Sequence, residues 1–109
     1  MKKLMVLAGC IALTTAAATA ADLAENWSKH CVSCHGKDGK GQTKAGKMAD
    51  TKDLTDATYQ ASFTDDQAIK QVKEGLKDKA GKDRMKPFRD KLSDEEIKAL
   101  VTFMRTFKK

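Results

Sequence analysis

The amino-acid sequence predicts a small all-α domain of three to five helices. Two capping-box patterns, beginning at Thr64 and Ser93, each precede apolar residues at helical spacing. No segment alternates convincingly between apolar and polar residues, as a half-buried strand would. The long segments between the expected helices are charged or rich in glycine, so we expect them to wrap around something other than a large polypeptide core.

Residues 1–21 have the layout of a secretory signal peptide. Two lysines precede an almost wholly apolar run, and a stretch of small residues follows it. This order predicts export to the periplasm and cleavage after Ala20 or Ala21, which leaves 22–109 as one small domain. Cys10 also fits the cleavage box of a bacterial lipoprotein, so a tether at Cys10 is the alternative.

The first expected helix leads into a cysteine motif. Leu23, Trp27 and Cys31 recur at every fourth position, which predicts a short helix that continues into the segment Cys31-Val-Ser-Cys34-His35. Two thiols at this spacing, followed directly by an imidazole, form the attachment pattern of a c-type haem. Both sulfurs can reach the vinyl groups on one edge of a porphyrin, and His35 can serve as the proximal ligand of the iron.

Two other interpretations of this motif are a redox dithiol and half of a zinc site. A redox dithiol belongs to a longer βαβ chain, for which there is no room here. A zinc site needs a second pair of ligands, but the other His and Cys are His30 and Cys10. The sequence therefore favours one covalently bound haem c.

Three further helices are expected along the chain. The first covers 56–61, and the second runs from the Thr64 capping box to Gly75. The third begins at the Ser93 capping box. Its apolar face consists of Ile97, Leu100, Val101, Met104 and Phe107. Segments 36–48 and 76–92 are left as loops.

A methionine is the expected second axial ligand of the iron. Met85 is an apolar thioether isolated in a charged loop, where packing gives no reason for it. Met48 is the second choice, with packing near the haem as its default role, and Met104 belongs to the helical apolar stripe. His30 lies on the same element as the motif and is expected to be a surface residue. A site without a second protein ligand is the remaining possibility.

The chain is basic, with a formal net charge of +6. The positive charge concentrates in 29–47 and 67–91, with an acidic stretch between them. Solubility alone can account for this charge. The functional alternative is a basic face that steers docking onto an acidic redox protein. The residues expected to guide that docking are Lys37, Lys40, Lys86 and Lys91.

These motifs, in this order, resemble those of a small bacterial class I c-type cytochrome. The matching segments are Cys31-Val-Ser-Cys34-His35-Gly36, Met85-Lys-Pro87-Phe88 and Leu92-Ser-Asp-Glu-Glu96. The resemblance implies the small cytochrome c fold, with crossing N- and C-terminal helices, Trp27 facing Leu100 and Phe103, and one exposed haem edge. It departs from the family at Leu23, where a glycine is usual, and in reading Met-x-Pro. A proline carbonyl that accepts the proximal His N–H is also missing, and a backbone carbonyl near Gly46 is the expected substitute.

The sequence thus predicts a soluble, monomeric electron carrier with no enzymatic activity of its own. His35 and Met85 would hold the iron, and Cys31 and Cys34 would form thioethers. We expect redox proteins as partners, no nucleic acid, and no stable membrane insertion. A haem sensor or peroxidase-like domain with an open sixth position is the alternative from another functional class.

Overall fold

The computed structural model describes Gly9 and residues 20–109. Most of the predicted signal peptide, including Cys10, lies outside the described residues. In the described part, the elements follow in the order α1 (Ala20–His30), α2 (Val32–His35), α3 (Lys44–Met48), α4 (Ala57–Ala61), α5 (Asp65–Glu74), β1 (Leu76–Lys77), β2 (Asp83–Met85) and α6 (Asp94–Arg105). The predicted, predominantly helical fold is confirmed.

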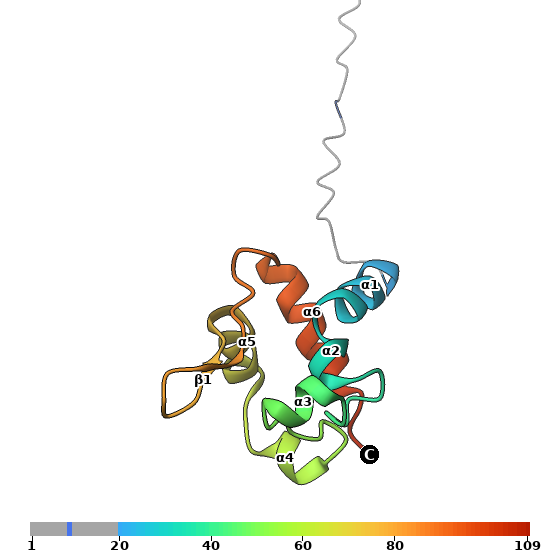
Figure 1. Ribbon diagram of the computed structural model, residues 1–109. Coiled ribbons are helices and arrows are strands. Elements are labelled where there is room, and N and C mark those ends of the chain that lie inside the picture. The colour runs from blue at the N-terminus through green and yellow to red at the C-terminus, as the bar shows by residue number, and fades with distance from the viewer. Residues whose placement is uncertain (1–8, 10–19) are drawn as a thin grey trace, which may run out of the picture.

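The C-terminal helix α6 lies at the centre of the domain (Figure 1). It packs against α1 on one side and against α5 on the other, while α2 and α3 pack together below α1. The buried residues of α6 are Ile97, Leu100, Val101 and Met104, as predicted, whereas Phe107, the fifth residue of the predicted apolar face, follows the helix and is half-buried. This stripe joins both flanking helices into one core.

Trp27 makes the principal aromatic contact between α1 and α6. Its ring centroid lies 5.3 Å from that of Phe103 on α6 and 5.2 Å from that of Phe107, which follows the helix. Trp27 and Leu100 also belong to the same buried cluster. The expected packing of the N-terminal helix against the C-terminal helix is therefore confirmed, although Leu23 replaces the usual glycine.

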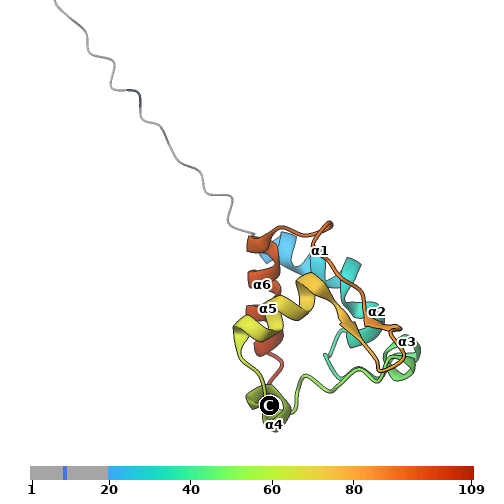
Figure 2. The same ribbon diagram turned by 90° about the vertical axis from the view of Figure 1, so that its left-hand side faces the viewer.

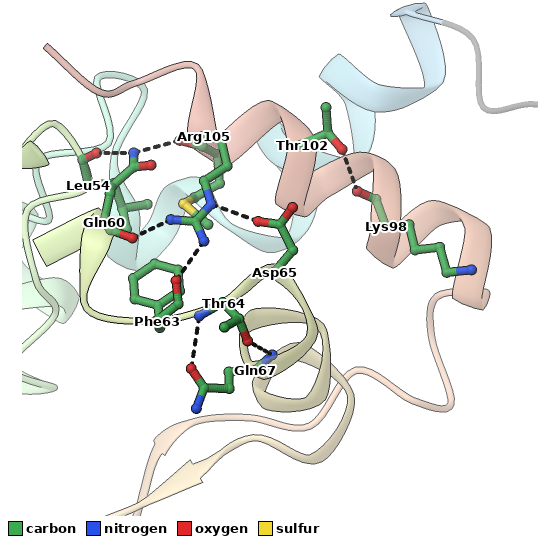
Figure 3. Close-up of polar contacts among 10 residues, drawn as sticks. Leu54, Gln60, Phe63, Thr64, Asp65, Gln67, Lys98, Thr102 and Arg105 are labelled. Carbon is green, nitrogen blue, oxygen red and sulfur yellow. Dashed lines mark hydrogen bonds and ion pairs between the residues drawn. The ribbon is translucent and has the colours of Figure 1, made fainter.

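Both capping boxes form as predicted. At the start of α5, the Thr64 hydroxyl accepts a hydrogen bond from Gln67 N at 3.1 Å, and Gln67 Oε1 accepts one from Thr64 N at 2.8 Å (Figure 3). Ser93 and Glu96 pair in the same way at the start of α6. These reciprocal bonds satisfy backbone donors that the first helical turn leaves free.

The structure has more regular elements than the sequence predicts. The described part contains six helices, whereas three to five are expected, and α3 lies inside the segment 36–48, which the sequence predicts to be a loop. An antiparallel hairpin of β1 and β2 lies inside the other expected loop, 76–92. These strands have two and three residues, too few to show an alternating pattern. Gly46 lowers the helical propensity of α3 and so hides it.

Arg105 joins the end of α6 to the segment between α4 and α5 (Figure 3). Its guanidinium donates to the carbonyl oxygens of Gln60 and Phe63 at 2.5 and 2.8 Å and to Asp65 Oδ1 at 2.8 Å. The buried Gln60 side chain in turn donates to the carbonyls of Leu54 and Met104. This network fixes the position of the chain that carries Tyr59 and Phe63.

Candidate functional site

The cysteine motif lies on a short helical segment directly after α1. Cys31 N donates to the carbonyl of Trp27, and His35 N donates to the carbonyl of Cys31, each at 2.9 Å. The helical path therefore continues through the motif and places His35 on the same side as the core. Cys31 and Cys34 are free, half-buried thiols.

Two neighbouring cavities of about 280 and 590 Å³ adjoin this motif. Both are lined by Cys31, His35, Leu54, Tyr59, Gln71, Met85 and Phe88. The smaller cavity reaches the apolar core at Trp27, Leu100 and Met104. The larger one reaches Cys34 and a set of charged residues at the surface. Together they form one hollow that is apolar inside and charged outside.

The three candidate methionines lie in different environments. Met85 lies on β2, is half-buried and lines both cavities together with His35. Its Sδ lies 3.9 Å from Nε2 of Gln71 on α5. Met104 is buried in the core, as expected, and lines the smaller cavity. Met48 is 81 % exposed on α3 and lines neither cavity. The expectation that Met48 packs near the cofactor is wrong, because α3 turns this side chain to solvent.

Burial lowers the pKa of His35 below its ordinary value. The imidazole is therefore neutral near pH 7, the form that can bind a metal. Its Nδ1 is buried and has no hydrogen-bond partner among the described residues. The acceptor expected near Gly46 is therefore not confirmed, and the Gly46 carbonyl instead accepts from Thr51 N at 2.8 Å.

Cys31 is also strongly affected by its surroundings. The pKa of the Cys31 thiol is raised to about 12, chiefly by burial and to a smaller extent by the charge of the neighbouring Cys34. In this folded environment the thiol stays protonated and is a weak nucleophile. Cys31 therefore lacks the low pKa that marks the attacking thiol of a reactive redox dithiol.

The residues around the hollow fit a haem. Two thiols, an imidazole and a thioether line the larger cavity, and apolar side chains line the smaller one. Two buried nitrogens, Trp27 Nε1 and His35 Nδ1, have no hydrogen-bond partner in the described chain. Buried polar groups are rarely left in this state, so the two nitrogens call for partners that the described residues do not supply.

Several predicted surface residues occupy unexpected positions. His30 is half-buried, and its ring centroid lies 5.6 Å from that of Phe88, so the prediction of a plain surface histidine is wrong. Of the four lysines expected to guide docking, Lys86 and Lys91 line the larger cavity, whereas Lys37 and Lys40 do not. Other basic residues around it are Lys29, Lys52 and Arg84.

Sequence reasoning missed several lining residues. Leu54, Tyr59 and Gln71 come from three separate segments, and their spacing carries no signal that would group them. Arg84 carries no such signal either, because the sequence does not distinguish it from the other charged residues of the segment 76–92.

None of the described helices, within Gly9 and residues 20–109, combines the length and apolar character needed to cross a membrane.

Comparison with known proteins adds a family to this geometry. The family model described as cytochrome C oxidase, cbb3-type, subunit III matches residues 18–104. Among solved structures, the chain is similar to the KustC0563 c-type cytochrome at 39 % sequence identity and a TM-score of 0.68, covering 78 % of this chain and 95 % of that one. A tyrosine-to-phenylalanine mutant of Kustc0563 matches at 38 % identity and a TM-score of 0.67, covering 80 % and 99 %. No curated protein matches significantly.

Proposed function

Since the chain belongs to the family of c-type cytochromes described by the cbb3-type subunit III model, and hence to electron-transfer proteins, we propose that it is a soluble periplasmic carrier that shuttles single electrons between redox proteins. The proposal includes one covalent haem c, with His35 and Met85 as axial ligands. It also includes removal of 1–21 on export and no enzymatic activity of the carrier itself.

One observation carries the proposal: His35 and Met85, which are far apart in the sequence, line the same two cavities. When bound, haem supplies an iron that alternates between ferric and ferrous states, and a methionine ligand raises its potential. His35 contributes a neutral imidazole, because burial disfavours its protonated form. Cys31 and Cys34 anchor the porphyrin edge by thioether bonds and take no part in electron exchange.

The apolar lining has its own role in this proposal. Leu54, Phe88 and three residues of α6 give the inner part of the hollow an apolar lining that disfavours water; the three are Leu100, Val101 and Met104. A dry, closely packed surrounding disfavours entry of exogenous ligands and supports a fixed coordination in both oxidation states. These are the requirements of a carrier rather than of a sensor or peroxidase.

The rim of the larger cavity supports docking onto an acidic partner. Its basic members are Lys29, Lys52, Arg84, Lys86 and Lys91, against the acidic residues Asp50 and Asp83. Such an excess of positive charge steers the encounter with an acidic surface and acts most strongly at low ionic strength. We therefore propose this rim as the place of electron exchange. Replacing both Lys86 and Lys91 by Glu should lower the association rate with an acidic redox protein and reduce its salt dependence.

The axial assignment is tested by the visible spectrum of the oxidised protein. We expect a methionine-to-iron charge-transfer band that Met85→Ala abolishes and Met48→Ala leaves unchanged. The reduced wild-type protein should bind carbon monoxide poorly. Absence of the band in the wild type, together with tight carbon monoxide binding, would instead support a sensor or peroxidase-like site.

Mass spectrometry of the exported protein tests the remaining parts. The expected species is 22–109 carrying one haem on the peptide that contains Cys31 and Cys34. A mature chain that begins at an acylated Cys10 would contradict the soluble form and support a tethered cytochrome.

A further inference from the structure

Arg84 precedes Met85 on β2 and reaches across to the segment that follows α3. Its Nε donates to the carbonyl of Ala49 at 3.0 Å, and its Nη2 donates to the carbonyl of Asp50 at 2.9 Å. Nη2 also lies 3.1 Å from Oδ2 of Asp50. The planar guanidinium thus holds two successive carbonyls and one carboxylate, an arrangement that a lysine ammonium cannot reproduce.

The backbone held by Arg84 is itself unusual. Asp50 has a φ of 54°, and among the described residues it is the one non-glycine residue with a positive φ. Such a conformation persists where surrounding contacts over-determine it. Here the contacts are those of Arg84, together with the hydrogen bond from Thr51 N to the carbonyl of Gly46 at 2.8 Å. The turn after α3 is therefore conformationally restrained, and Arg84 attaches β2 to it.

The opposite side of Met85 is attached to α5. Met85 pairs with Leu76 in the hairpin, and Phe88 N donates to the carbonyl of Val72 at 2.9 Å. A side-chain carbon added at Gly75 would lie 2.5 Å from the Met85 carbonyl, so the two backbones pass in close contact. These contacts hold the segment to α5 but not to the part of the domain that carries His35.

Arg84 connects the segment to that part of the domain, in addition to the ring contact of Phe88 with His30. The turn after α3 is linked to the cysteine motif, because the Thr43 hydroxyl at the start of α3 contacts the carbonyls of Ser33 and Cys34. In the view of Figure 2 the hairpin lies next to α3, and the hydrogen bonds of Arg84 to Ala49 and Asp50 join the two. Asp50, Arg84, Met85 and His35 all line the larger cavity, so this link closes one wall of it.

We propose that Arg84 is a positioning residue that holds Met85 in the cavity it shares with His35 by clasping the carbonyls of Ala49 and Asp50. The inference rests on the proposed function, because it assumes Met85 as the axial ligand. Without the clasp, β2 stays attached to α5 but is released from α3. The sixth position of the iron is then open to small ligands for a larger fraction of the time.

The test compares Arg84→Ala with Arg89→Ala in the haem-loaded full chain. Arg89 is a matched control, since it follows the same loop and pairs with Glu74 at 3.5 Å but makes no contact with α3. We expect Arg84→Ala to weaken the methionine-to-iron band and to raise the apparent affinity of the reduced protein for carbon monoxide about tenfold. Arg89→Ala should leave both unchanged.

Two further variants separate the contacts of the clasp. Asp50→Asn keeps both carbonyl acceptors and tolerates positive φ, so it should retain most of the band. Arg84→Lys keeps the charge but not the fork, so it should bind carbon monoxide more tightly than the wild type. It also serves as the test if Arg84→Ala fails to load haem.

The inference is overturned if folded Arg84→Ala and Arg84→Lys match Arg89→Ala in band intensity and carbon monoxide affinity. It is also overturned if Asp50→Asn loses the band as fully as Arg84→Ala, because the charge pair would then carry the effect. Failure of the proposed ligand is distinguishable, since Met85→Ala itself would then leave the band intact.

Discussion

The hydroxyl oxygen of Thr43 lies 2.6 Å from the carbonyl oxygen of Ser33, inside the cysteine motif. The same hydroxyl lies 3.0 Å from the carbonyl of Cys34 and accepts a hydrogen bond from Gly46 N at 2.9 Å. One side chain therefore caps α3 and joins it to α2. The contact gives the segment after the motif a defined path, and it lies next to the residues proposed to bind haem.

Replacing Thr43 by Ala should destabilise the haem-loaded protein by about 1–2 kcal/mol, because α3 loses its cap and its link to α2. Urea denaturation monitored by circular dichroism measures this loss. Thr102→Ala is the control, since that hydroxyl contacts only the carbonyl of Lys98 within α6 (Figure 3), and it should change stability by about 0.5 kcal/mol or less. Equal effects of the two changes would contradict the linking role of Thr43.

Gly46 allows close contact between α3 and the cysteine motif. A side-chain carbon at this position would collide with the carbonyl of Cys34 and would lie 2.6 Å from that of Gly41. Gly46→Ala should therefore cost about 2–3 kcal/mol and reduce the yield of haem-loaded protein, as pyridine haemochrome assays can measure. Gly81→Ala, where φ is +80° but no atom is near, should cost about 1 kcal/mol and leave haem content unchanged.

Among the arginines, we expect substitution of Arg105 to lower the free energy of unfolding most. Its guanidinium donates to three acceptors and stacks 4.4 Å from the Phe63 ring centroid. Arg105→Ala should cost about 2–3 kcal/mol in thermal or urea unfolding, because two partly buried carbonyls lose their partner. Arg105→Lys should recover little of this loss, since one ammonium cannot reach all three acceptors. Arg89→Ala, which removes a more exposed ion pair, should cost about 1 kcal/mol or less.

Glu96 predicts a pH dependence of stability. Hydrogen bonds from the backbone of Ser93 and then from the Asn26 side chain lower the pKa of this carboxyl below its ordinary value of 4.5. A lowered folded-state pKa contributes stability that is complete above pH 4.5 and is lost as the pH falls through the folded-state pKa. Glu96→Gln keeps a capping box but cannot take up this proton. The free energy of unfolding of the variant should therefore fall less between pH 6 and pH 3 than that of the wild type. The same acid slope in Glu96→Gln as in the wild type would contradict this role, and Glu95→Gln is the matched control.

Local sequence signals predicted much of this fold. The capping boxes at Thr64 and Ser93, and the apolar stripe of α6, depend on residues within one or two helical turns, so they can be identified without tertiary information. By contrast, α3 depends on the contact of Thr43 with Ser33, and the hairpin depends on the close approach of Gly75 to Met85. Such elements are fixed by tertiary contacts that no local pattern reveals.

The candidate site was predictable to a similar extent. The cysteine motif has a fixed spacing set by haem chemistry, so Cys31, Cys34 and His35 stand out in any reading of the sequence. Met85 stands out because a charged loop gives an apolar thioether no packing role, and the structure brings it to the same cavities as His35. The solvent-facing orientation of Met48 and the role of Arg84 could not be predicted, because both depend on how α3 and β2 are placed relative to each other.

The pair of axial ligands is the central claim, and X-ray absorption at the iron edge measures it most directly. We predict one sulfur scatterer and five nitrogen scatterers around iron in the oxidised wild-type protein, as a porphyrin with His35 and Met85 requires. The sulfur should disappear in Met85→Ala and remain in Met48→Ala. An iron without sulfur in the wild type, or a sulfur that persists in Met85→Ala, would contradict the account.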